Sequence, residues 1–221
     1  AQNMQNNRNM EKLKLTEEWD KTFPKSDKVD HSKVTFVNRF GITLAADLYV
    51  PKIAVADKFP AIVVSGPFGA VKEQSSGLYA QTLAERGFLT IAFDPSFTGE
   101  SSGQPRSVAS PDINTEDFSA AVDYLATRPD VDAERIGILG ICGWGGFAIN
   151  AAANDTRIKA TVASTMYDIS RANANGYFDA ADNADARYRI RRELNAQRTK
   201  DYRTGTYPCT TMNPEPAEDA P

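Results

Sequence analysis

The stretch "RIGILGICGWGGFAINAAAND", residues 135–155, joins a short apolar run to a cluster of glycines through a cysteine. "RIGILGI" has the length and isoleucine content of a buried strand, and "WGGFAINAAAN" is predicted to continue as a helix. A sharp turn between them would push the Cys142 side chain out above the sheet, where the helix N-terminus favours its anionic form. Cys142 is therefore a candidate nucleophile, and a small buried residue is the alternative reading.

The neighbours of Cys142 fit a tight strand-to-helix turn on one side only. Gly140 lies two residues before Cys142 and Gly143 follows it, as the close approach of two backbones requires. The usual G-x-nucleophile-x-G spacing would place glycine at 144, but Trp144 stands there and the glycine is displaced to Gly145. We expect the indole to point away from the turn or to help wall a pocket.

Buried strands and helices alternate on either side of this stretch. Three further apolar runs are predicted strands: "FPAIVVSG" (59–66), "FLTIAFD" (88–94) and "IKATVAST" (158–165). Helices are predicted within 73–87, where Leu78, Tyr79, Thr82 and Leu83 share one face, and within 114–130, with Asn114 as N-cap. This order predicts an α/β fold with parallel pairing and helices on both faces of the sheet.

The N-terminal part differs in composition from this core. Residues 1–31 are rich in amides and charges and are predicted to form an arm, with a short helix capped at Thr16 and ending before Pro24. Residues 33–50 contain two β-rich runs separated by "NRFG", which predicts an antiparallel hairpin that Pro51 ends.

The C-terminal part is polar. Residues 169–206 are predicted to form a lid-like helical region with a narrow apolar stripe of Ala186, Ile190 and Leu194, and residues 207–221 a loose loop. Seven Lys or Arg side chains between 187 and 203 are interleaved with acids, which indicates a solvated face rather than a phosphate site. The expected organisation is thus an arm (1–31), an α/β core (32–168), a lid-like helical region (169–206) and a loose C-terminal loop (207–221).

Composition excludes several classes of partner. The 221 residues are 41% hydrophobic, enough for one sizeable domain, and carry a formal net charge of −4. No positive field is available to gather nucleic acid or an anionic membrane, and no apolar run approaches the roughly 20 residues that span a bilayer. Cys142 and Cys209 fit neither a disulfide framework nor a zinc site. The start at Ala1-Gln2 suits signal-peptide removal and a shortened sequence equally, so exported and cytoplasmic locations are both open.

Five segments, taken in order, resemble the α/β-hydrolases, in particular their bacterial dienelactone-hydrolase-like and peptidase-like branch: "VTFVNRFGITLAADLYVP", "SGPFGAVKEQ", "FDPSFTGESSGQP", "RIGILGICGWGG" and "STMYD". The resemblance covers residues 34–168, the N-terminal two-thirds of such a fold. It implies a three-layer, mostly parallel sheet with an N-terminal hairpin, of which this chain would hold strands one to six of eight. It also implies a nucleophile at Cys142.

The resemblance further implies an oxyanion hole built from two backbone N–H groups. One maps to Gly143, directly after the nucleophile. The other falls in the loop 66–69, where Pro67 has no N–H, so we expect Phe68 to donate it, with an aromatic lid as a compatible alternative. Pro67 and Trp144 would line the pocket. Glu100 and Ser101 resemble a structural loop of the family, and no metal or organic cofactor is implied.

A thiol nucleophile needs a base and an acid to orient it, and the resemblance places both late in the chain. His31 is the single histidine, and it precedes the first predicted strand, far from Cys142, so a linker position is the better interpretation. Asp168, after the sixth strand, could serve as the acid but would have no histidine to orient.

Two interpretations follow. In the first, the chain is part of a split or nicked hydrolase that uses a Cys142 acyl-enzyme on a small ester, thioester, lactone or activated amide, with acid and histidine on a companion segment. In the second, it is a truncated, non-catalytic binding module with a dead pocket. The first is favoured because strand 158–165 would otherwise leave an unpaired edge. Activity is expected only if the missing strands complete the fold.

Overall fold

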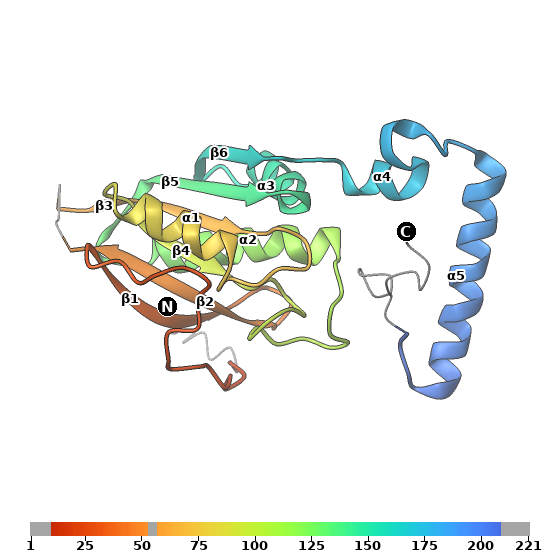
Figure 1. Ribbon diagram of the computed structural model, residues 1–221, viewed down its shortest axis with the longest axis horizontal. Coiled ribbons are helices and arrows are strands. Elements are labelled where there is room, and N and C mark those ends of the chain that lie inside the picture. The colour runs from red at the N-terminus through yellow and green to blue at the C-terminus, as the bar shows by residue number, and fades with distance from the viewer. Residues whose placement is uncertain (1–9, 53–56, 209–221) are drawn as a thin grey trace, which may run out of the picture. The chain divides into compact units, whose positions relative to one another are not determined.

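The computed structural model describes residues 10–52 and 57–208, and the chain divides into two compact units after Ile169. Figure 1 shows a six-stranded sheet with flanking helices in the first unit and helices in the second. The strands are β1 (Val29–Val37), β2 (Thr43–Pro51), β3 (Phe59–Ser65), β4 (Leu89–Phe93), β5 (Val131–Ile141) and β6 (Ile158–Ser164). The helices are α1 (Ser75–Ala84), α2 (Pro111–Ala126), α3 (Gly143–Asn154), α4 (Ile169–Asn175), the 3-10 turn η1 (Tyr177–Asp179) and α5 (Ala184–Thr204).

The sheet has the order β1-β2-β4-β3-β5-β6. Strands β1 and β2 form the predicted antiparallel hairpin, whose turn places Gly41 at φ 80°. Strand β2 joins β4 in antiparallel pairing, whereas β3 pairs in parallel with β4 and β5, and β5 with β6. The predicted mixed α/β sheet is therefore confirmed, and the carboxyl ends of β3, β4 and β5 meet at one edge.

Two apolar clusters cover the two faces of the sheet. Helices α2 and α3 pack on one face through Phe118, Val122, Leu125 and Phe147, and helix α1 packs on the other through Ala80 and Ala84. Successive residues of a strand supply opposite faces, as the pleat requires. In β5, for example, Ile138 joins the first cluster and Leu139 the second. The result is the predicted three-layer arrangement.

Helix α1 buries a different face from the one predicted. Leu78 and Tyr79 are 45% and 42% exposed, while the buried residues are Ser76, Gly77, Ala80, Gln81 and Ala84. A β-carbon on Gly77 would lie 2.2 Å from the Lys72 carbonyl oxygen and 3.0 Å from the Phe23 ring. Close approach to neighbouring backbone therefore selects the small residues for the interior, and hydrophobicity alone predicts the wrong face.

The start of α2, the conformation of residues 10–28 and the start of β1 also differ from prediction. Helix α2 begins at Pro111 with Ser110 at its N-cap, because the buried Asn114 side chain lies inside the helix and accepts a bond from the Ser110 N–H. Residues 10–28 contain no helix. Their polar groups bind distant partners instead, as where the Thr16 N–H donates to Glu100 Oε1 at 2.6 Å. Strand β1 starts at Val29, so His31 belongs to the sheet and not to a linker.

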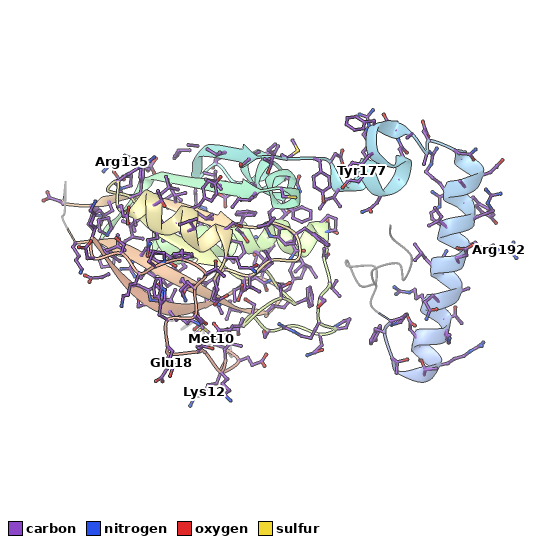
Figure 2. The ribbon with its side chains drawn as sticks, in the orientation of Figure 1. Met10, Lys12, Glu18, Arg135, Tyr177 and Arg192 are labelled. Atoms are coloured by element: carbon purple, nitrogen blue, oxygen red, sulfur yellow. The ribbon has the colours of Figure 1, made fainter. Side chains whose placement is uncertain are left out.

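The second unit, from Ser170 onward, is helical and polar. Helix α5 is capped at its start by Asn183, whose side chain accepts a bond from the Ala186 N–H, and at its end by Gly205 in the left-handed conformation. Ile190 and Leu194 of the predicted stripe are 52% and 62% exposed, and Figure 2 shows Arg192 projecting from the same helix. Among the described residues, no helix is long and apolar enough to cross a membrane.

Candidate active site

Cys142 lies at the junction of β5 and α3, as the sequence predicts. Its backbone adopts φ 58° and ψ −127°, a conformation that non-glycine residues rarely occupy, and it forms the N-cap of α3. The Cys142 N–H donates to the Ser164 carbonyl at 2.8 Å, and its own carbonyl accepts from the Gly145 N–H at 2.9 Å. The thiol is free and partly exposed. The turn thus places a partly exposed thiol at the carboxyl edge of the sheet, where it packs against the apolar cluster that includes Leu139 and Ile141.

The glycines around Cys142 are required by neighbouring atoms. A β-carbon on Gly140 would lie 2.3 Å from the Trp144 carbonyl oxygen and 2.8 Å from the Ala148 β-carbon. One on Gly145 would lie 2.8 Å from the Met166 β-carbon. Strand β5, helix α3 and the segment after β6 therefore pack at distances that only glycine permits.

Trp144 takes the position where a glycine is usual, and a second strand makes room for it. The indole is 3% exposed and packs against Phe68 and Phe147, with ring centroids 5.7 and 5.1 Å apart. A β-carbon on Gly66, at the end of β3, would lie 2.8 Å from the Trp144 β-carbon. The indole therefore points into the apolar cluster beside Phe68 and not across the turn.

The two residues proposed for the oxyanion hole lie next to each other. The Phe68 β-carbon is 3.7 Å from the place where a β-carbon of Gly143 would be. As the first residue of α3, Gly143 has an N–H with no carbonyl partner inside the helix. Pro67, partly buried, connects Gly66 to Phe68 in the same loop. The loop after β3 thus reaches the elbow that carries Cys142.

Asp168 belongs to the segment that packs on the first turn of α3. Ile169 and Met166, on either side of it, lie against Gly143 and Gly145. Asp168 itself is exposed. This segment brings a carboxylate into the neighbourhood of the elbow, without a histidine beside it among the described residues.

His31 lies far from Cys142. Its Nε2 is 2.8 Å from Asp47 Oδ1, and its ring packs against Trp19 and Tyr49 at centroid distances of 5.1 Å each. Three strands separate β1 from β5 in the sheet, which corresponds to roughly 19 Å at about 4.8 Å per strand. His31 also lines a surface hollow of about 800 Å³ between the arm and β1, which does not include Cys142. Cys209 falls outside the described residues.

A buried charged cluster near the same edge of the sheet was assigned no role from the sequence. The Lys72 ammonium binds three carboxylates, Glu73 at 2.5 Å and Asp94 and Glu100 at 2.8 Å each, and the side chains of Lys72 and Asp94 are fully buried. In contrast to this buried cluster, Met10, Lys12 and Glu18 of the N-terminal arm are exposed, and Figure 2 shows their positions. The sequence offered one signal, because "KEQ" places charges in a loop between two buried elements.

The cluster shifts the pKa values of its members. Burial would lower the pKa of Lys72, but the charge and hydrogen bonds of Asp94 outweigh it and raise the pKa above its ordinary value. Burial would likewise raise the pKa of Glu100, but hydrogen bonds from Lys33 and Lys72 lower it to about 2. Burial, with the Asp94 charge, raises the pKa of Glu73. Three carboxylate oxygens within 4.8 Å of one another thus share an ammonium.

A mixed sheet of this order, with a cysteine on a strained strand-to-helix turn at its carboxyl edge, defines the α/β-hydrolase class. Residues 41–219 match the profile of the X-Pro dipeptidyl-peptidase (S15) family, and the chain belongs to that family. This agrees with the resemblance inferred from its sequence segments.

Similar proteins and structures support the same class. The chain is 66% identical over 194 residues to the uncharacterized protein PA2218 of Pseudomonas aeruginosa, covering 88% of this chain and 52% of that protein. The crystal structure of PA2218 superposes with a TM-score of 0.86 at 65% identity, covering 89% of this chain and 61% of that one.

More distant relatives carry functional names. Thiohydrolase aneE of Aspergillus aculeatus is 35% identical over 129 residues, covering 58% of this chain and 39% of that protein. The structure of the α/β-hydrolase GrgF from Penicillium sp. sh18 superposes with a TM-score of 0.55 at 28% identity, covering 60% and 44%. The chain therefore spans about half of the length of PA2218 and less than half of the length of aneE.

Proposed function

We propose that this chain supplies the nucleophile of an acyl-transfer hydrolase. The observation that carries the proposal is the backbone of Cys142, φ 58° and ψ −127° at the N-cap of α3, which presents a free thiol at the carboxyl edge of the sheet. A thiolate there attacks the acyl carbon, so that a C–S bond forms and the bond to the leaving group breaks. The leaving group departs as its anion, or takes the thiol proton from the base of the companion segment, and water then hydrolyses the acyl-enzyme to release the acid and regenerate the thiol.

The backbone N–H groups of Gly143 and Phe68 are the proposed oxyanion donors. The two residues lie close together, with the Phe68 β-carbon 3.7 Å from the β-position of Gly143, and this supports a shared site for the developing negative charge. Removal of one such donor costs on the order of 3 kcal/mol in the barrier, or about a hundredfold in rate. Pro67 flanks these donors and is the proposed lining of the acyl pocket, whereas the buried Trp144 indole would support Phe68 from the apolar cluster behind it.

We propose that the base and its acid come from a companion segment. His31 is bound to Asp47 across the sheet, and it is the single histidine in the sequence. Strand β6 pairs only with β5 among the described residues, and Lys159 to Val162 on it are exposed. An edge strand with exposed residues favours pairing with a further segment. Asp168, in the segment after β6, is a candidate orienting acid.

Among esters, thioesters, lactones and activated amides, thioesters are the proposed substrate class. A thiolate leaving group departs without a proton, whereas an amide nitrogen needs a general acid, and the described residues place no histidine beside Cys142. The relative named thiohydrolase supports the same choice. Esters and lactones react by the same steps, and amides would depend on the companion segment.

The alternative is a non-catalytic binding module that keeps the pocket. Acylation of Cys142 by 4-nitrophenyl acetate at pH 9.5, followed by peptide-resolved mass spectrometry, separates the two. Ordinary cysteine thiols ionise near pH 8.5, so this pH supplies thiolate without a protein base. We expect Cys142 to be acylated at least about tenfold faster than Cys209. The Cys142→Ala variant should lose the rapid initial release of 4-nitrophenolate. Equal rates at the two cysteines would support the binding module. A copurifying, histidine-containing polypeptide would support the companion segment.

A further inference from the structure

The backbone and the side chain of Lys72 bind the same carboxylate. The Lys72 N–H donates to Asp94 Oδ1 at 2.8 Å, and its Nζ donates to Asp94 Oδ2 at 2.8 Å. Asp94 directly follows β4, so its position is fixed by the sheet. The Glu100 N–H donates to Asp94 Oδ2 at 2.9 Å. Asp94 therefore ties the loop after β3 to the loop after β4.

The loop 66–74 is held at its two ends. At the first end, Gly66 packs against the Ile141 carbonyl and the Trp144 β-carbon of the elbow. At the second, the Lys72 carbonyl oxygen lies 2.2 Å from the place where a β-carbon of Gly77 would be, and the Glu73 carbonyl accepts from the Thr22 N–H at 3.0 Å. Phe68 lies between these two anchors. Its position beside Gly143 therefore depends on both.

The charges of the cluster make the second anchor depend on one ammonium. Lys72 neutralises Asp94 and shares Glu73 and Glu100 with Lys33, which contacts Glu100 at 2.8 Å and Glu73 at 3.6 Å. Lys33 is on β1, and among the described residues its ammonium pairs with Asp20, Glu73 and Glu100 and not with Asp94. Without Lys72, three carboxylates would face one another, and repulsion would push the loop away from Asp94.

We propose that Lys72 is a positioning residue that sets the Phe68 N–H beside Gly143 by anchoring the loop 66–74 to Asp94. The inference rests on the proposed function, in which that N–H stabilises the oxyanion. Lys72 does not touch the acyl group. It acts on the step that develops charge on the carbonyl oxygen, and not on the nucleophilicity of the thiol.

The full chain with Lys72→Met tests this, and Lys33→Met is the matched control because it removes an equal charge from the same cluster. Acylation of Cys142 by 4-nitrophenyl acetate needs the oxyanion donors, whereas alkylation by iodoacetamide develops no oxyanion. We expect Lys72→Met to slow acylation at least about tenfold, with alkylation unchanged within about twofold. Lys33→Met should change neither rate by more than about twofold.

Hydrogen exchange of the peptide spanning 66–72 gives a second readout that does not depend on catalysis. Lys72→Met should accelerate exchange of the Ala70 N–H, which donates to the Pro67 carbonyl at 3.2 Å within this loop, and Asp94→Asn, which retains the ammonium, should do the same. Parallel loss of acylation and alkylation, or unchanged exchange at Ala70, would overturn the inference. If the wild type is not acylated, the proposed function fails, and exchange at Ala70 alone decides whether Lys72 positions the loop. Should Lys72→Met not fold, Asp94→Asn carries both measurements.

Discussion

A β-carbon on Gly66 would lie 2.8 Å from the β-carbon of Trp144, so the end of β3 and the first turn of α3 fit together only because residue 66 is glycine. Gly66 also has φ 98°, which other residues avoid. A side chain at position 144, two residues after Cys142, thus fits because the residue at the end of the neighbouring strand β3 has none. This explains how a tryptophan can follow Cys142 so closely.

Trp144→Ala should destabilise the fold by about 3–5 kcal/mol, because the 3% exposed indole fills space between Phe68 and Phe147. Trp144→Phe should cost only about 1–2 kcal/mol, since the indole N–H has no hydrogen-bond partner among the described residues. Urea unfolding measures both, and Phe40→Ala, at a 58% exposed ring, should stay within about 0.5 kcal/mol. Equal losses for both Trp144 variants would contradict the packing account.

Gly140→Ala and Gly146→Ala form a matched pair. At Gly140 the new methyl group would meet the Trp144 carbonyl oxygen at 2.3 Å, and a loss of about 1–3 kcal/mol is expected. At Gly146 the nearest atom, the Tyr167 carbonyl oxygen, is 3.7 Å away, so alanine should stabilise α3 by up to about 1 kcal/mol. Thermal unfolding distinguishes them, and a stabilising Gly140→Ala would refute the described elbow packing.

Glu100 should make stability depend on pH at the acid end. The pKa of Glu100 is about 2 in the folded protein, below its ordinary 4.5, so the unfolded chain takes up a proton first as the pH falls. The stability due to Glu100 is complete above about pH 4.5 and is lost toward pH 2. Urea midpoints should therefore differ more between wild type and Glu100→Gln at pH 7 than at pH 3. The exposed Glu18→Gln is the control, and a difference that grows on acidification would disprove the assignment.

His31→Gln should lower the free energy of unfolding and leave the rate of Cys142 acylation unchanged. Its Nε2 binds the buried Asp47 carboxylate, which also forms an ion pair with Lys21 at 3.1 Å, so the expected loss is about 1–3 kcal/mol. The rate of Cys142 acylation at pH 9.5 should stay within about twofold of wild type. A large rate loss in a fully folded variant would mean that His31 does act on Cys142.

The pattern of apolar residues in the sequence was sufficient to predict the strands of the core, but not which residues make close contacts with neighbouring backbone. The runs at 59–66 and 88–94 are apolar over most of their length and the run at 158–165 over half of it, so β3, β4 and β6 could be predicted along with the hairpin. The buried face of α1 could not. Its small residues face inward because the Lys72 carbonyl and the Phe23 ring approach Gly77, and those contacts come from segments outside the helix.

The candidate site divides in the same way. Cys142, Gly143 and Gly140 lie within one local pattern and could be found from it. Lys72 and Asp94 come from loops after two different strands, and each resembles an ordinary surface charge in the sequence. Only the parallel pairing of β3 and β4 brings their loops together and buries them.

Glu100 accepts hydrogen bonds from the Thr16 N–H, from Lys33 and from Lys72, so one carboxylate joins the arm, the first strand and a loop of the proposed site. Substitutions at 33, 72 and 100 are therefore expected to be coupled, whereas position 16, which contributes only its backbone N–H, need only avoid proline. The N-terminal arm, which its composition alone would suggest is dispensable, is expected to be inherited together with the loops it fastens.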